Sequence, residues 1–238
     1  MKFEILGKPA YSTLKILLSP GESVTTEAGS MMAMEGDLTV ETTTGGIIKG
    51  LLRKMLAGET LFMNVYHAGP GGGVLWLAPS TPGDVKYIPL QGDGIIVQDM
   101  SYLAHHGNVD MSITWRGLRG MIAEGNLFWL KLSGYGGVWV NAYGHIVERM
   151  LKPGERVTVD NFHFVAMSDD VRWSIGKFGG LKSFFFGGEG FVINIEGPGK
   201  LYLQTRTMTD LADILRRFLP SGSGSSTSFR VGPFGLGV

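Results

Sequence analysis

Three stretches of the sequence decide the fold: they are Leu61–Pro79 (LFMNVYHAGPGGGVLWLAP), Leu127–Gly144 (LFWLKLSGYGGVWVNAYG) and Phe191–Arg206 (FVINIEGPGKLYLQTR). In each stretch an apolar run leads into a glycine-rich segment, and a second run rich in Val, Leu, Trp or Tyr follows. Two β-rich runs on either side of a glycine cluster are typical of a β-hairpin. The sequence therefore predicts one hairpin that is repeated three times.

The surroundings of the three predicted hairpins repeat as well. A glutamate precedes each of them, at Glu59, Glu124 and Glu189, so that successive copies are 65 residues apart. Short segments around a shared alanine also correspond: Met32–Met34, Leu103–His105 and Val165–Met167. Repeated short strands at this spacing predict an all-β fold of three β-sandwich or double-stranded β-helix-like units. Because each unit is too small to bury its own faces well, we expect the three to pack in a pseudo-threefold arrangement.

The expected domain organisation follows from this repeat. It comprises N-terminal strands (1–21), three β repeats (22–90, 91–152 and 153–206), a C-terminal helix (207–220) and a Gly/Ser linker with an apolar tail (221–238). The helix itself is predicted for Thr209–Leu219, because Thr209 can cap the first turn and Pro220 ends the last. Another amphipathic segment, Ile47–Leu56, fits either a short helix packed on the β core or a helix on a membrane surface.

Composition excludes several classes of function. The 238 residues carry no formal net charge at pH 7, so the chain has no global electrostatic footprint for nucleic acid. The absence of cysteine excludes disulfides, thiolate metal sites and cysteine nucleophiles, and it fits a reducing compartment. Only 18% of the residues are charged whereas 44% are apolar, and this balance predicts either much buried surface or a sizeable subunit interface.

The start of the chain bears on its location. Residues Met1–Lys15 alternate in polarity and lack the apolar core of a signal peptide. We therefore expect a cytoplasmic protein, with peripheral contact to a membrane as an alternative.

Candidate ligand-binding residues are few. His67 and His145 could gather in space with Glu59, Glu124 and Glu189 to hold a metal ion, and equivalent carboxylates near a pseudo-threefold axis could form a cation site. Alternatively, the glutamates accept hydrogen bonds from nearby backbone N–H groups in turns. The sequence contains no H-x-H pair, and its glycine clusters precede strands rather than helices, unlike phosphate-binding loops. We therefore expect no catalytic residue, no metal and no cofactor, and these five side chains are named only as candidates.

Several short motifs, in this order and spacing, resemble the AIM twenty-four (altered inheritance of mitochondria) family over roughly residues 20–207. They are Ala78-Pro79 with Pro82-Gly83-Asp84, Val159-Asp160-Asn161, Val165-Ala166, Gly179–Lys182, Gly188-Glu189-Gly190, Gly197-Pro198-Gly199 and Gln204-Thr205-Arg206. The resemblance implies a prokaryotic member whose fold is similar to the tryptophan RNA-binding attenuation protein, with three β-sandwich units in one chain. Mitochondrial members are implicated in inner-membrane organisation, and the resemblance supplies no catalytic residues.

These observations favour a non-enzymatic β-rich scaffold or interaction module. We expect a homo-oligomer that contacts protein partners or a membrane surface. One alternative is a module that binds a small ligand or a metal in clefts between the repeats. A second alternative is an RNA-binding protein, but the predicted hairpins carry few Lys or Arg residues, so no nucleic acid is expected.

Overall fold

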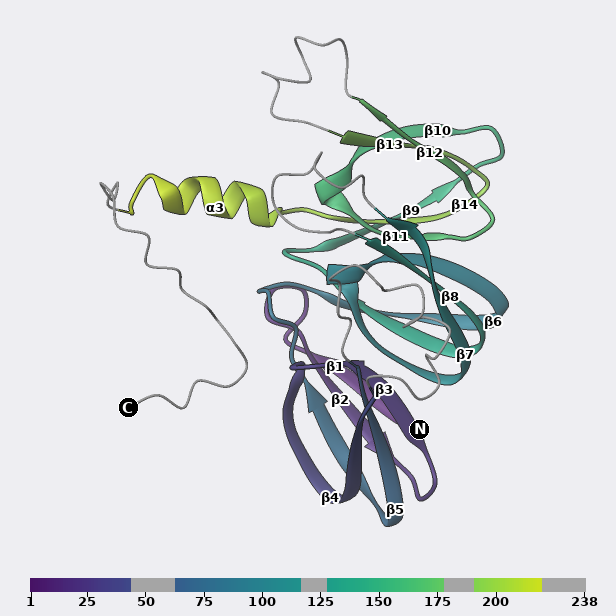
Figure 1. The fold of residues 1–238 in the computed structure, drawn as a ribbon, viewed down its shortest axis with the longest axis vertical. Helices are drawn as coiled ribbons and strands as arrows, with labels where there is room; N and C mark the ends of the chain where they lie inside the picture. The colour runs from purple at the N-terminus through teal and green to yellow at the C-terminus, as the bar shows by residue number, and fades with distance from the viewer. Residues whose placement is uncertain (44–62, 117–127, 178–190, 220–238) are drawn as a thin grey trace. The chain divides into compact units, whose positions relative to one another are not determined.

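The computed structural model of the chain describes residues 1–43, 63–116, 128–177 and 191–219 (Figure 1). The chain divides into two compact units, Met1–Thr207 and Met208–Val238. Several predicted features lie outside the described residues: Glu59, Glu124, Glu189, the helix at Ile47–Leu56 and the tail 221–238. The prediction of an all-β fold with one short C-terminal helix is confirmed.

Two short 3-10 helices, η1 (Asp99–Ser101) and η2 (Asn161–His163), lie between described strands of the first unit. The strands are β1 (Lys2–Leu6), β2 (Thr13–Leu18), β3 (Ser23–Glu27), β4 (Met31–Thr43), β5 (Met63–Leu77), β6 (Val85–Gln98), β7 (Tyr102–Arg116), β8 (Phe128–Asn141), β9 (Ile146–Leu151), β10 (Arg156–Asp160), β11 (Phe164–Ser168), β12 (Arg172–Lys177), β13 (Phe191–Glu196) and β14 (Gly199–Gln204).

These strands form two sheets, and every pair of named strands is antiparallel. The large sheet has the order β1-β2-β5-β3-β7-β8-β6-β11-β14-β9, and β4 pairs with β5 outside this path. The small sheet has the order β10-β13-β12. Some neighbouring strands are distant in sequence. The pair β3–β7 joins the first part of the unit to its middle part, and the pair β6–β11 joins the middle part to the last part.

The first two predicted hairpins are wrong, because each is a single long strand. Leu61–Pro79 contains β5, which stays continuous through its glycine cluster, and Leu127–Gly144 contains β8. The two halves of β5 have different neighbours: Met63–His67 pairs with β3, whereas Gly73–Leu77 pairs with β2. The glycines thus mark a bend within a strand, which is another common use of glycine in sheets.

The third predicted hairpin is wrong for a different reason. Its two runs are separate strands, β13 and β14, but they do not pair with each other. Strand β13 pairs with β10 and β12 in the small sheet, whereas β14 pairs with β9 and β11 in the large sheet. The intervening Gly197-Pro198 therefore marks the point where the chain passes from one sheet to the other.

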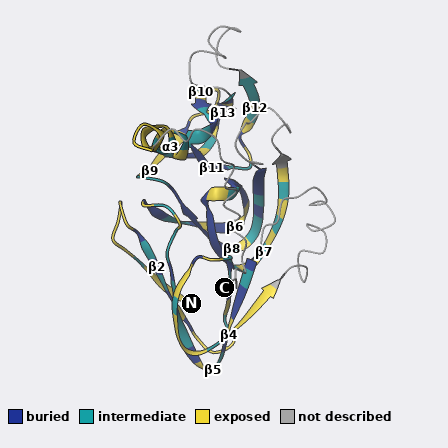
Figure 2. Cartoon of the chain, turned by 60° about the vertical axis from the view of Figure 1, so that its left-hand side comes forward, coloured by how far each residue is buried: buried dark blue, intermediate teal, exposed yellow. Residues whose placement is uncertain are grey.

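The apolar side chains of the first unit gather in three clusters. One cluster centres on Leu130, Val138 and Tyr202, a second on Leu14, Leu75 and Trp139, and a third on Trp129, Phe164 and Ile193. Buried residues are concentrated on β6, β8 and β11, while β4 is largely exposed (Figure 2). The central strands therefore hold the core, and β4 contributes an open surface.

The second unit contains helix α3 (Met208–Arg216). This agrees with the predicted helix at Thr209–Leu219 to within a few residues at each end. In the described ranges of the chain, no helix has the length and the apolar composition needed to cross a membrane.

Candidate functional site

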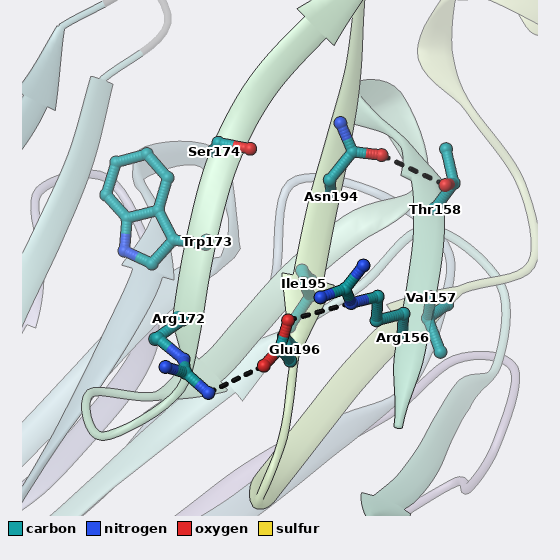
Figure 3. A pocket seen from close by; sticks show the side chains of 9 residues that line it. All are labelled: Arg156, Val157, Thr158, Arg172, Trp173, Ser174, Asn194, Ile195 and Glu196. Carbon is teal, nitrogen blue, oxygen red and sulfur yellow. Dashed lines mark hydrogen bonds and ion pairs between the residues drawn. The ribbon is translucent and has the colours of Figure 1, made fainter. Parts of the chain in front are cut away.

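The outward face of the small sheet carries a row of charged side chains beside a groove of about 470 Å³ (Figure 3). Strand register places Glu196 of β13 directly between Arg156 of β10 and Arg172 of β12. Its carboxylate accepts hydrogen bonds from both guanidinium groups, from Arg156 Nε at 2.8 Å and from Arg172 Nη2 at 2.6 Å. Side chains directly opposite one another on adjacent strands lie close enough to pair in this way.

The two arginines keep Glu196 ionised. The hydrogen bond from Arg156 is the main cause of a lowered pKa of the Glu196 carboxyl group, and Arg172 contributes as well. One carboxylate neutralises only one of two guanidinium groups, so the row retains one positive charge. Both arginine side chains are about 80% exposed, at 81% and 79%, which leaves them accessible to an acidic partner.

The next row along the same face is polar but uncharged. Thr158 Oγ1 donates a hydrogen bond to Asn194 Oδ1 at 3.0 Å, and Ser174 lies across from Asn194 on β12. Figure 3 shows these side chains beside the arginine row on the exposed face of the sheet. Nothing drawn there pairs a nucleophile with a base, as covalent catalysis requires. The face suits reversible polar recognition.

A buried carboxylate, Asp84, forms a second polar cluster, where three strand connections meet. Asp84 is only 2% exposed. One oxygen, Oδ1, accepts a hydrogen bond from the Val85 N–H at 2.9 Å and lies 3.4 Å from Lys8 Nζ. The other oxygen, Oδ2, lies 3.2 Å from His145 Nδ1. Buried charges in proteins are normally paired and hydrogen-bonded in this manner.

The Asp84 cluster contains an aspartate, a histidine and a serine, but not in the order of a catalytic triad. Ser12 Oγ donates to Asp84 Oδ1 at 3.5 Å, so the serine contacts the carboxylate itself. In a triad the histidine stands between the serine and the aspartate and removes the serine proton. The arrangement instead ties the connections β1–β2, β5–β6 and β8–β9 together.

A third cluster is buried where β3 meets β7. The phenol of Tyr102 contacts His105 Nδ1 at 2.8 Å and donates to the Thr25 carbonyl at 3.2 Å. Burial lowers the pKa of His105 to about 4, and it raises the pKa of the nearby Glu27 to about 7, with Asp99 adding repulsion. Both side chains are therefore biased towards their neutral forms, as desolvation demands.

A smaller groove of about 330 Å³ lies where β6 meets the turns around β9, β11 and β14. Its lining includes Asp93, Asp170, Lys200 and Tyr202. Lysine and aspartate side chains around an open groove could hold a small polar molecule.

The structure separates the two histidines named from the sequence. His67 lies on β5, largely exposed, with Nε2 3.8 Å from Glu41 Oε2. His145 instead contacts Asp84. The part of the chain that the structure describes contains no group of three or more His, Cys, Asp or Glu side chains able to hold a metal ion. The three candidate glutamates lie outside that part.

Sequence reasoning missed the residues that make the clusters. In the sequence, Asp84 stood out only as part of the motif Pro82-Gly83-Asp84, and Glu196 only as a residue of the third predicted hairpin. The partners of both come from positions far away in the chain. The sequence signal for Glu196 was limited to the presence of Arg156 and Arg172 in the same predicted repeat, 153–206.

Comparisons with known proteins agree with one another. The chain is 28% identical over 232 residues to an uncharacterized protein of Streptococcus pyogenes, covering 94% of this chain and 93% of that protein. A crystal structure of a Streptococcus pyogenes protein superposes with a TM-score of 0.77 at 30% identity, covering 92% of this chain and 99% of the other.

A fungal protein and a family profile also match the chain. The Verticillium alfalfae protein named Altered inheritance of mitochondria protein 24, mitochondrial, is 26% identical over 170 residues, which cover 70% of this chain and 43% of that protein. The profile of the family described as Mitochondrial biogenesis AIM24 matches residues 3–206. Because that match spans nearly all of the first unit, the chain belongs to the AIM24 family.

Proposed function

We propose that this chain is a non-enzymatic, β-rich scaffold that assembles with further copies of itself. The observation that carries the proposal is that β4 and β10, like β1, β9 and β12 at the other sheet ends, each pair on one side only within the described residues. An unpaired strand edge exposes a row of N–H and C=O groups that can pair with another chain. The low charge of the sequence supports the same conclusion.

The scaffold consists of three copies of one unit, and each copy contains six paired strand segments. The copies span residues 13–77, 85–141 and 146–204. In the first copy, Gly73–Leu77 pairs with β2 and with the start of β4, while Met63–His67 pairs with β3 and with the end of β4. The halves of β8 relate to β6 and β7 in the same way. Strands β14 and β13 have the corresponding neighbours in the last copy. These bounds shift the sequence-based ones towards the N-terminus.

Matching turns support the three copies. Gly21, Gly92 and Gly154 have φ angles of 79°, 96° and 77°. Each is followed by a carboxylate that accepts a backbone hydrogen bond: Glu22 from Ser19, Asp93 from Gln91 and Glu155 from Lys152. A register shift also occurs in each copy just before the shared alanine, at Ala33, Ala104 and Ala166. A glycine turn, a carboxylate that accepts a backbone hydrogen bond and a bulge, in the same order in each copy, support a common unit.

The absence of enzymatic activity is part of the proposal. The ion pairs of Asp84 and Glu196 have clear structural roles, because they join strand connections and neighbouring strands. A scaffold of this kind is expected in the cytoplasm, in keeping with a sequence that lacks cysteine. Fractionation of cells that express a tagged chain would check the location.

Light scattering coupled to size-exclusion chromatography tests the scaffold. The purified full chain is expected to elute with a mass of several chains at every concentration above its dissociation constant. A mass of one chain at every concentration would contradict the proposal.

A second function, the binding of a small polar ligand, is favoured by the groove lined by Asp93, Asp170 and Lys200. A thermal-shift screen of small polar metabolites, compared with the variant Lys200→Ala, would test it. Stabilisation that disappears in the variant supports ligand binding, since a ligand that binds only the folded state raises the melting temperature. No stabilisation by any compound would leave the scaffold as the single function.

A further inference from the structure

Three methionines at the start of β4 are exposed although they occupy positions that are buried elsewhere in the chain. The exposed fractions of Met31, Met32 and Met34 are 43%, 54% and 45%. In the second copy of the repeated unit the matching residues Tyr102 and Leu103 are 0% exposed, and in the third copy Phe164, Val165 and Met167 are also 0% exposed. A contiguous apolar surface of this kind commonly marks an interaction site.

The difference arises because the second and third copies each have a preceding copy beside them. Strand β7 is covered by β3, with Thr25 opposite His105 and Thr26 opposite Ala104. Strand β11 is covered in the same register by β6, with Ile96 opposite Met167 and Val97 opposite Ala166. The start of β4 has β5 on one side and, among the described strands, no neighbour on the other.

The complementary edge lies at the opposite end of the series of copies. Strand β10 occupies the position that β3 and the end of β6 occupy in the first two copies, and each of those strands pairs with the following copy. In the described part of the chain β10 pairs only with β13. Its edge and the groove beside Thr158 and Arg156, seen in Figure 3, therefore lie where a following copy would dock.

We propose that β10 of one molecule pairs with the start of β4 of a second molecule. The inference rests on the scaffold proposed above and names its interface. Successive copies within the chain are joined by the pairs β3–β7 and β6–β11, which we call the internal joints. If the two molecules pair in the same register, Thr158 lies opposite the second molecule's Met34 and Val159 opposite its Ala33, in antiparallel orientation. The three methionines are then covered by the small sheet, as Phe164, Val165 and Met167 are covered within the chain.

Charges on the two surfaces complement each other. At the internal joint between the second and third copies, Lys131 Nζ lies 2.8 Å from Asp169 Oδ2, and the Asp169 N–H donates to the Gly94 carbonyl at 3.1 Å. At the proposed contact between molecules, the β10 side is basic: the exposed pair Arg156 and Arg172 keeps one net positive charge beside Glu196. The acidic side is Glu35 and Asp37, which follow Met34 on β4. Complementary charge favours this pairing over pairing of like edges.

Each molecule has one β4 edge and one β10 edge, so the contact is head-to-tail. Such a heterologous interface generates either a closed ring or an open filament. This geometry makes a distinctive prediction. A substitution that prevents pairing at the β4 edge leaves the β10 edge able to pair, and a substitution at the β10 edge leaves the β4 edge able to pair.

The test compares four variants of the full chain by light scattering. Met34→Asp places a charge in the β4 edge, and Thr158→Asp places one at the facing position of β10. Each is expected to reduce the assembly to single chains, while Met150→Asp, at a methionine of β9 that is 62% exposed, leaves it intact. The double variant M34D/T158K puts opposite charges in register and is expected to restore assembly. A misfolded variant would not be rescued, and circular dichroism of each variant checks folding.

Mixing the first two variants gives the decisive measurement. M34D and T158D together are expected to form a complex of two chains and nothing larger, because the one intact β10 edge meets the one intact β4 edge. A mixture that remains single chains, or an oligomeric wild type that neither substitution affects, would overturn this interface while leaving the scaffold standing. A wild type that is a single chain would overturn both proposals.

Discussion

Gly83 and Gly144 form a parallel bridge between two strand connections. The Gly144 N–H donates to the Pro82 carbonyl at 3.0 Å, and the Asp84 N–H donates to the Gly144 carbonyl at 2.8 Å. The connection from β5 to β6 is thereby fastened to the connection from β8 to β9. The Gly83 carbonyl also accepts from the Ser12 N–H at 2.9 Å, which adds the connection from β1 to β2.

The bridge predicts that Gly83→Ala is strongly destabilising. An added methyl group would overlap the Ala142 carbonyl oxygen and approach Gly144 N and O within 2.8 Å, and these are backbone atoms that cannot swing away. We expect a loss of about 1–3 kcal/mol in the free energy of unfolding, measured by urea denaturation. Gly176→Ala is the matched control, because the nearest atom there is the end of the flexible Asn194 side chain. Equal stability of the two variants would contradict the prediction.

Asp84→Ala should be costly for an electrostatic reason. The substitution leaves the buried Val85 N–H without its acceptor and leaves Lys8 and His145 without their carboxylate. A loss of about 2–4 kcal/mol is expected in the same denaturation experiment. Lys8→Ala should cost less than about 1 kcal/mol, since that side chain is half exposed. If the lysine variant proved the more damaging one, Asp84 would not be the centre of the cluster.

The sequence predicted strands best where local signals suffice. The alternating polarity of Met1–Lys15 accompanied the prediction of N-terminal strands within residues 1–21, and β1 (Lys2–Leu6) and β2 (Thr13–Leu18) lie there. The predicted hairpins failed because a glycine cluster specifies a special backbone conformation without saying whether the chain reverses. In β5 it bends instead, with Gly72 at φ +64°, because β2 and β3 supply separate partners for the two halves.

The candidate site could be predicted less well than the fold. The ion pairs of Asp84 and Glu196 depend on which distant segments become neighbours, and strand register decides that. Local sequence does not encode register between strands that are far apart in the chain. The uneven exposure of the matching residues Met34, His105 and Met167 likewise became visible only once the pairing of β3 with β7 and of β6 with β11 was known.

The cluster of Glu27 and His105 makes stability depend on pH in two opposite directions. The raised pKa of Glu27, about 7 against 4.5, means that stability falls as the pH rises through that window, because the folded state holds a proton that the unfolded state releases. The lowered pKa of His105, about 4 against 6.5, means that stability falls as the pH drops through its own window. The two contributions oppose each other where the windows overlap.

Glu27→Gln isolates the first contribution. The variant should gain stability relative to the wild type as the pH rises from 4.5 to 7, and the gain should level off above that range at roughly 3 kcal/mol. Thermal unfolding across this range would measure it. Glu4→Gln, at an exposed position of β1, is the control and should give a much smaller change with pH. A constant difference for Glu27→Gln would refute the assignment.

Trp139 combines a buried ring with a buried polar atom that the described residues leave without a hydrogen bond, Nε1. The indole is 0% exposed, and the rings of Phe3, Tyr87 and His106 lie 5.2, 5.2 and 5.1 Å from it, centroid to centroid. Trp139→Phe removes the unpaired N–H, worth about 1–3 kcal/mol, and this offsets much of the lost packing. The free energy of unfolding should therefore change by less than about 1.5 kcal/mol. Trp139→Ala leaves a cavity instead and should cost about 3–5 kcal/mol. Comparable losses for both variants in denaturant unfolding would mean that the indole nitrogen is satisfied in solution.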